Sequence, residues 1–233
     1  MKIAPMICNV SKNSKISYSE VSFGHGHSES SSYNKKQKAI VSTTTALGVI
    51  GALAILAKRA NYSLAPKKMF SNIKKSYLAK VDYHDKEVIT IGAGSCLGGL
   101  AGGYLIDKNP YNRKAKRREA LMQIGNISIP ILTVEGFAKI GEKHGKVAKA
   151  FAATTGIFVG IYLANFLMNV LSNAVFQDKS GERGVKATDF SAHLDDAVVA
   201  ASYISDSKIV KGIARFVPAA LLFAGNEVGN KEG

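Results

Sequence analysis

The chain has 233 residues and a formal net charge of +14, because 31 Lys and Arg face 17 Asp and Glu. This length accommodates one ordinary domain or roughly four to five membrane crossings of about 20 residues each, so it excludes neither a soluble nor a membrane protein. The positive charge predicts an anionic partner. The two cysteines, Cys8 and Cys96, lie in segments of such different polarity that no disulfide is expected.

Residues 1–38 are rich in Ser, Asn and Lys and contain only isolated apolar residues. This composition predicts a disordered polar tail without a secretory signal peptide. His25 and His27 lie in this tail, but two ligands on a flexible segment make a poor metal site, so we expect no metal there.

Two apolar blocks are long enough to cross a bilayer as helices. Ala39–Ala57 and Val88–Ile106 each contain 19 residues without a charged side chain. Lys and Arg flank the first block at both ends, as expected where a membrane helix meets anionic headgroups. A buried helix of a soluble protein is the alternative, but such a helix is rarely apolar around its whole circumference.

Glycines in the second block recur at helical spacing. Gly94, Gly98 and Gly102 repeat every four residues, so one side of the predicted helix has almost no side chains. Another backbone can approach this side closely, which is how helices associate in lipid. The repeat is typical of a glycine zipper and predicts a helix-packing surface.

The start of the same block also looks like the strand and glycine turn that open a dinucleotide-binding unit, because Val88–Gly94 reads Val-Ile-Thr-Ile-Gly-Ala-Gly. Such a unit requires a second strand that ends in an acidic residue about 20 positions later. The sequence there, Asn-Pro-Tyr-Asn-Arg-Lys, has no apolar alternation. We therefore predict no nucleotide cofactor.

Ala120–Ile140 is a less pure apolar block, interrupted by Gln123, Asn126 and Glu135. Polar groups in lipid must find partners, so we expect this helix to face its neighbours. Glu135 stands four residues before Lys139, a spacing that predicts an ion pair on the helix surface. A carboxylate coupled to proton or ion movement is the alternative.

Val147–Leu171 is a long apolar block in which small residues and asparagines each recur at helical spacing. Gly156 and Gly160 belong to a second small-residue surface. A polar stripe recurs every four residues and consists of Asn165, Asn169 and Asn173. Its amides are expected to bond to the polar side of the preceding block, and a water-lined path for a polar solute is the alternative.

Lys and Arg concentrate between the blocks: residues 58–87 hold eight, and a short connection over residues 107–119 holds six. A basic amphipathic helix is expected to begin at Pro66. Charges in these places predict anionic lipid headgroups as partners and no nucleic acid. For a four-helix bundle, the two possible orientations place nearly equal numbers of Lys and Arg on the outer side, so the positive-inside rule does not choose between them. This result is also the best argument for the alternative, a soluble helical protein.

The last part of the chain, residues 178–233, has a different character. It contains a charged loop and then an amphipathic helix with Asp189, His193 and Asp196 on one side. No second group of ligands accompanies these residues, so no metal site is predicted. Ile209–Gly225 includes two basic residues and a proline, which predicts an interfacial or re-entrant helix, with a last crossing as the alternative.

Together these patterns predict an all-α, multi-pass transmembrane bundle of about four spans, with a polar tail (1–38), the bundle (39–177) and a peripheral part (178–233). We expect an integral protein of a plasma or inner membrane that contacts anionic lipid and a second copy or another membrane protein. A structural or helix-interaction role is favoured, and a small transporter or channel for an ion or polar solute is the alternative. No catalytic arrangement has supporting context, so an enzyme is not favoured.

Overall fold

The computed structural model describes residues 32–61, 85–177, 184–185 and 217–233, and every regular element within these residues is a helix. The helices are α1 (Lys35–Arg59), α4 (Asp85–Ile106), α5 (Pro110–Glu142), α6 (Lys146–Phe176) and α10 (Val217–Asn230). The expected all-α class is confirmed, and α1, α4, α5 and α6 are long and apolar enough to cross a membrane. The tail up to residue 31 and the helices expected after Pro66 and Asp189 lie outside the described residues.

The start of α1 is determined by a reciprocal cap. The side-chain oxygen of Asn34 accepts a hydrogen bond from the N–H of Gln37, and the Gln37 side chain accepts one from the N–H of Asn34, both at 3.0 Å. This capping box satisfies backbone donors that have no partner inside the helix. The helix therefore begins four residues before the uncharged block, and its first turn is basic.

Helix α5 begins earlier than the sequence predicted. The side chain of Asn109 accepts from the N–H of Tyr111 at 3.0 Å, and Pro110 occupies the first helical position, where no N–H is needed. Residues 110–119 are therefore helical, and the expectation of a connection over residues 107–119 is wrong. The physical reason is that a capping Asn followed by Pro starts a helix, and Lys and Arg are good helix formers.

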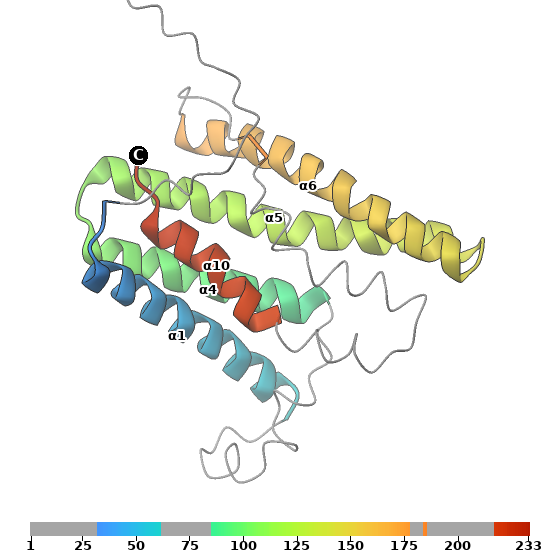
Figure 1. Cartoon of the computed structure of the whole chain (residues 1–233), viewed down its shortest axis with the longest axis horizontal. Helices are drawn as coiled ribbons and strands as arrows, with labels where there is room; N and C mark the ends of the chain where they lie inside the picture. Colours follow the sequence, from blue (N-terminus) through green and yellow to red (C-terminus); the bar gives the residue numbers. More distant parts are fainter. Residues whose placement is uncertain (1–31, 62–84, 178–183, 186–216) are drawn as a thin grey trace, which may run out of the picture.

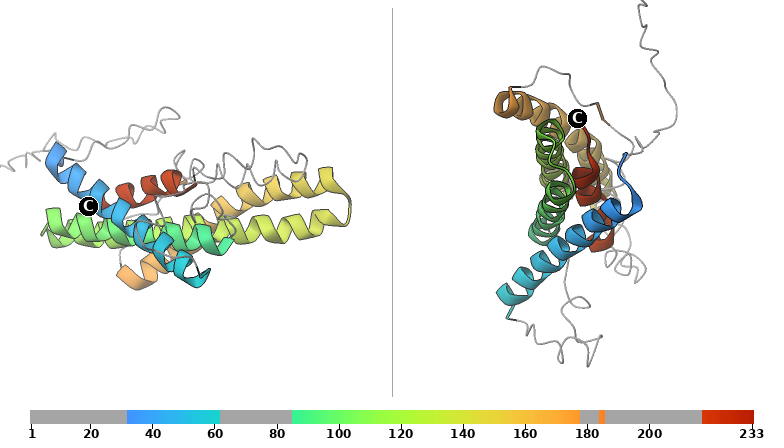
Figure 2. Two further views of the ribbon diagram at one scale, coloured as in Figure 1. Left: turned by 90° about the horizontal axis from the view of Figure 1, so that it is seen from below. Right: turned by 90° about the vertical axis from the view of Figure 1, so that its left-hand side faces the viewer.

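The four long helices alternate in direction, so that each runs antiparallel to the next one along the chain (Figure 1). Helix α4 lies in the centre, with α1, α5 and α10 packed around it. Helices α5 and α6 have 33 and 31 residues, which correspond to roughly 45–50 Å each, and they form a hairpin that extends beyond the other helices (Figure 2). The main apolar core lies where α1, α4, α5 and α10 meet.

One side of α4 packs against α1 through the three predicted glycines. A Cβ atom added at Gly94 would lie within 3.0 Å of the backbone of Gly48, and one added at Gly98 would lie equally close to the backbone of Thr44. Gly102 approaches the side chain of the same threonine. A larger residue at any of these positions would therefore separate the two helices.

The opposite side of α4 packs against α10 in the same manner. A Cβ atom added at Gly99 would come within 3.0 Å of the backbone of Gly225, and one added at Gly103 would lie 2.8 Å from the carbonyl oxygen of Gly229. Backbone therefore meets backbone on two sides of α4. This arrangement places the short helix α10 directly against the centre of the bundle.

The hairpin of α5 and α6 also depends on glycines identified in the sequence. Cβ atoms added at Gly156 and Gly160 would lie 2.9 Å and 2.5 Å from the Cα atoms of Val134 and Pro130, respectively. The hydroxyl of Thr133 donates a hydrogen bond to the carbonyl oxygen of Gly156 at 2.9 Å, which adds a polar contact between the helices. The two predicted glycines of α6 thus lie against α5.

The first part of the helix expected over Ile209–Gly225 lies outside the described residues, and α10 continues past the expected end to Asn230. Its described part spans 14 residues, or about 21 Å. Leu221 and Val228 are fully buried in the main core, so α10 packs into the bundle. The reason is the pair of glycines on α10, which permits close contact with α4.

The glycine contacts generate a test with a matched control. Gly98→Ala places a methyl group against the α1 backbone and is expected to lower the free energy of unfolding by about 1–3 kcal/mol through overpacking. Gly51→Ala adds the same methyl group to α1 where no atom of another described element lies within 4 Å, so stability should be unchanged or rise by about 0.5–1 kcal/mol. Thermal unfolding in detergent measures both, and equal effects would contradict the packing described for α4.

Candidate functional site

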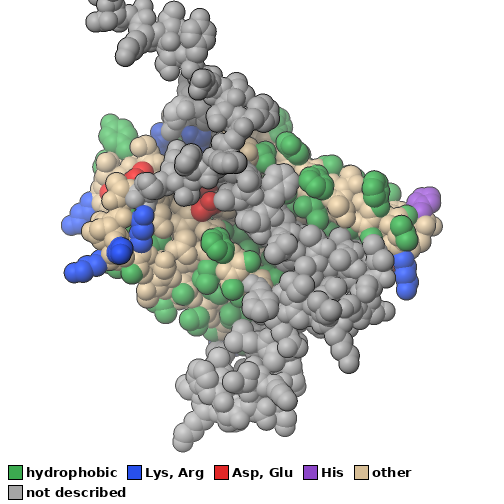
Figure 3. All heavy atoms as spheres, viewed as in Figure 1, with side chains coloured by type: hydrophobic (Ala, Val, Ile, Leu, Met, Phe, Trp, Pro, Cys, Tyr) green, Lys and Arg blue, Asp and Glu red, His purple; other side chains and the backbone are tan. Residues whose placement is uncertain are grey.

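Large apolar side chains cover much of the outer surface, whereas several polar side chains are buried. Figure 3 shows hydrophobic side chains along the length of the molecule and Lys and Arg towards its ends. The exposed apolar residues of α6 include Phe151, Phe158, Tyr162, Phe166 and Val170. The buried polar residues are Thr45, Ser95, Lys116, Glu119, Gln123, Asn126, Asn165, Asn169 and Ser172. Burial of a polar side chain is unfavourable unless the side chain is hydrogen-bonded, so each of these residues requires a structural or functional reason. We therefore consider the buried polar residues as the candidate functional site.

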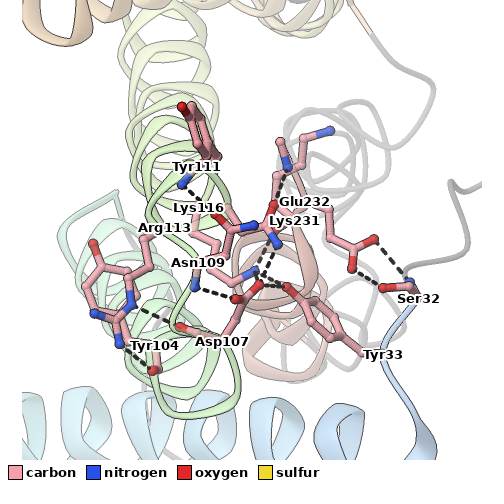
Figure 4. A network of polar contacts seen from close by, with 12 residues as sticks. Ser32, Tyr33, Tyr104, Asp107, Asn109, Tyr111, Arg113, Lys116, Lys231 and Glu232 are labelled. Atoms are coloured by element: carbon pink, nitrogen blue, oxygen red, sulfur yellow. Dashed lines mark hydrogen bonds and ion pairs between the residues drawn. The ribbon is translucent and has the colours of Figure 1, made fainter.

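One group of polar residues lies where the start of α1, the turn between α4 and α5, and the end of α10 meet (Figure 4). We call it the terminal polar cluster, and it consists of Ser32, Tyr33, Asp107, Asn109, Asn112, Arg113, Lys116, Lys231 and Glu232. Its central residue is Lys116, whose side chain has no exposed surface. The Lys116 ammonium donates to the hydroxyl of Tyr33 at 2.8 Å and to the carbonyl oxygen of Lys231 at 2.5 Å, and it lies 3.9 Å from the carboxylate of Asp107.

Asp107 is the anionic partner in this cluster. It accepts hydrogen bonds from the Tyr33 hydroxyl, from the N–H of Asn109 at 2.8 Å and from the amide of Asn112 at 2.6 Å. Burial opposes ionisation of Asp107, but these hydrogen bonds and the charge of Lys116 hold its pKa below the ordinary value. Burial, followed by the bond to Asp107, raises the pKa of Tyr33, so the phenol stays protonated and donates.

Arg113 ties the start of α5 to the end of α4. Its Nε donates to the carbonyl oxygen of Asp107 at 2.9 Å, and a terminal nitrogen donates to that of Tyr104 at 3.1 Å. The guanidinium also lies 4.9 Å from the centre of the Tyr104 ring. Carbonyl groups at a helix C-terminus lack partners within the helix and carry partial negative charge, so a cation stabilises them.

A second polar group lies further along α5. The amide nitrogen of Gln123 is 2.9 Å from a carboxylate oxygen of Glu119 and 2.5 Å from one of Glu227 on α10. An amide NH₂ carries two hydrogens, so it can donate to both carboxylates. Glu119 is 4% exposed, and Glu227 is half-buried. Gln123 therefore links α5 to α10 inside the bundle.

The predicted polar residues have different surroundings. The amide of Asn169 donates to the side-chain oxygen of Asn165 at 2.6 Å within α6, and both residues are buried, whereas Asn173 is half-buried. Asn126 is 1% exposed, and its side chain has no hydrogen-bond partner among the described residues. A bond between Asn126 and the stripe on α6, as expected from the sequence, is therefore not present.

Glu135 lies on the surface and not inside the bundle. Its carboxylate accepts from the ammonium of Lys139 at 2.7 Å, and both side chains are largely exposed. This is the surface ion pair expected from the spacing of four residues. The structure therefore gives no support to a buried role for Glu135.

The sequence alone did not indicate that Lys116 and Glu119 are buried or that Glu227 is half-buried inside the bundle. Lys116 and Glu119 precede Gln123 at helical spacing, but the basic run around them was interpreted as a connection. The position of Glu227 could not be predicted from the sequence, because it depends on the packing of α10 against α4 and α5. Among the described residues, no group of three or more His, Cys, Asp or Glu side chains is arranged to hold a metal ion.

The terminal polar cluster predicts unequal effects for two tyrosines. Tyr33→Phe removes the hydroxyl between Lys116 and Asp107 and should lower the free energy of unfolding by about 1–3 kcal/mol, because both groups lose a partner. Tyr111→Phe makes the same chemical change at a residue that is 77% exposed and should have no measurable effect. Chemical denaturation in detergent compares them, and a neutral Tyr33→Phe variant would rule out a stabilising role for the cluster.

Comparison of the chain with protein families, with curated proteins and with solved structures finds no match. No activity, ligand or partner is therefore suggested by similarity. The function has to be argued from the distribution of apolar, basic and buried polar residues in this chain.

Proposed function

We propose that the protein is an integral, multi-pass membrane protein with a structural or helix-interaction role. The observation that carries the proposal is the apolar outer surface of helices that are long enough to cross a bilayer. On α6, aromatic residues such as Phe151 and Phe166 are 76% and 65% exposed. A soluble protein rarely exposes a continuous apolar surface of this kind, whereas acyl chains would cover it without cost.

The distribution of charge supports the same setting. Basic residues flank the helices at one end of the bundle, where α1 and α5 begin, and at the other, where α6 begins. We propose that these residues contact anionic lipid headgroups on both sides of a plasma or inner membrane. Since both ends are basic, charge alone does not orient the bundle, as the sequence also indicated.

The polar contacts inside the bundle support a structural role over transport. Ser95 donates to the carbonyl oxygen of Leu221 at 2.7 Å, and Ser42 donates to Asn226 at 2.7 Å. Together with the bond from Gln123 to Glu227, these contacts join neighbouring helices. Hydrogen bonds between helices and close glycine contacts are the two features that hold helices together in lipid.

The partner in such a role would be a second copy or another membrane protein. Among the described helices, α6 packs extensively only against α5, and it exposes large apolar side chains such as Phe151, Phe158 and Phe166. A helix that is covered on one side offers a long surface to a neighbour within the membrane. We propose that this open surface of α6 is the surface through which the protein interacts.

Membrane insertion is tested by fractionation. We expect the chain to sediment with membranes and to resist extraction by alkaline carbonate, because α1, α4, α5 and α6 are each long and apolar enough to span the bilayer. Detergent should release it, and a peripheral protein in the same preparation serves as the control. Recovery of the chain in the carbonate supernatant would exclude the proposal.

The transporter alternative is favoured by one observation, the burial of Glu119 next to Gln123. For a structural role, vesicles containing the wild-type chain should show the same flux of protons, ions and small polar solutes as empty vesicles. Flux above this background that is lost in Glu119→Gln and kept in Glu135→Gln would support transport instead. The second variant makes the same change at an exposed carboxylate and is the matched control.

A further inference from the structure

The hairpin of α5 and α6 contains two asparagines whose amides are buried and incompletely bonded. Asn126 is 1% exposed, and neither its side-chain oxygen nor its nitrogen has a partner among the described residues. Asn165 is 6% exposed; its oxygen accepts from Asn169 at 2.6 Å, but its nitrogen has no partner in the same part of the chain. Buried amides are nearly always hydrogen-bonded, so each of these groups requires an explanation.

The packing of the hairpin places the two asparagines at the same level. A Cβ atom added at Gly125 would meet the side chain of Met168, and one added at Gly160 would meet Pro130. Since α5 and α6 are antiparallel, the residues between these two contacts lie opposite one another, and they include Asn126 and Asn165. The two amides nevertheless do not bond to each other.

The backbone of α5 adds a further acceptor at this level. In an α-helix the carbonyl of Asn126 would accept from the N–H of residue 130, but that residue is Pro130 and has no N–H. The level therefore presents amide donors from both asparagines together with the side-chain oxygen and the backbone carbonyl of Asn126. Donors and acceptors occur together, and none of these groups is charged.

A series of polar residues on α5 leads from this level to the end of the bundle. Lys116, Glu119, Gln123 and Asn126 follow one another at intervals of three or four residues, so they lie on one side of the helix. The first of them belongs to the terminal polar cluster at the end of the bundle. Buried polar groups therefore extend continuously from the terminal polar cluster to the level of Asn126.

From these observations we infer that Asn126 and Asn165 form a binding site for a small uncharged molecule with both hydrogen-bond donors and acceptors. Water is the smallest molecule of this class, and simple amides and polyols are larger members. An ion does not fit, because none of the groups described at this level is charged and burial of an uncompensated charge is strongly unfavourable. The inference rests on the fold of the hairpin and not on the proposed membrane role.

The site can be tested by NMR on the full chain in deuterated detergent, with ¹⁵N in the asparagine side chains. Nuclear Overhauser effects from the side-chain amide protons are measured to water and to the methyl protons of added acetamide or acetate. These two probes have nearly the same shape, but acetate is charged. We expect signals from Asn126 and Asn165 to water or acetamide, and none to acetate.

Two variants complete the experiment. Asn126→Leu keeps the branched shape of the side chain but removes its polar atoms, and it should abolish the signal at Asn165 as well, because the two residues share the ligand. Thr155→Val is the control: it removes a hydroxyl of α6 that already bonds to the carbonyl of Phe151 at 3.0 Å, and it should leave both signals unchanged. Should Asn126→Leu not fold, Asn165→Leu tests the same link from the other helix, with loss of the signal at Asn126.

The outcomes separate the possible occupants. Signals to water alone identify water as the ligand, and signals to acetamide that replace those to water identify a site for larger solutes. Absence of both, an equal signal to acetate, or an Asn165 signal that survives in Asn126→Leu would overturn the inference. A chain that carbonate extracts from membranes but that gives the expected signals would contradict the membrane proposal and leave this site intact.

Discussion

The rest of the structure depends on the close approach of α4 to helices on two of its sides. Gly98 permits the α1 backbone to come near, and Gly99, on the other side, does the same for α10. Because side chains are absent at both contacts, backbone atoms pack directly, and dispersion acts over many atom pairs. The polar links from α4 and α5 to α10, at Ser95 and at Gln123, form only if α10 is held at this distance.

The terminal polar cluster joins parts of the chain that are far apart in sequence. Lys116 on α5 bonds to Tyr33 before α1 and to the carbonyl of Lys231 after α10, while Asp107 lies in the turn between α4 and α5. A buried ammonium is stable only when anions and acceptors surround it, so the lysine requires all three segments. The cluster therefore fixes the end of the bundle at which the helices α1, α5 and α10 meet.

The lengths of the helices are consistent with the proposed bilayer setting. Helix α5 is roughly 50 Å long, whereas the hydrocarbon core of a membrane is about 30 Å thick, so part of α5 would lie beyond the acyl chains. Its first three turns carry most of the basic residues of the helix, including Arg113 and Lys116. Lys116 and the terminal polar cluster would then lie at the level of the headgroups, and Asn126 would lie deeper, within the apolar part.

The sequence by itself determined the helical blocks, the small-residue sides of α4 and α6, and the surface pairing of Glu135 with Lys139, because these follow from periodicity within one helix. It did not determine which helix each glycine meets, since Gly98 and Gly99 are adjacent in sequence but contact different helices. The position of α10 and the burial of Lys116 were likewise decided only by the tertiary structure. The physical reason is that a buried polar group depends on partners distant in sequence, as Lys116 depends on Tyr33 and Lys231, and no local pattern records them.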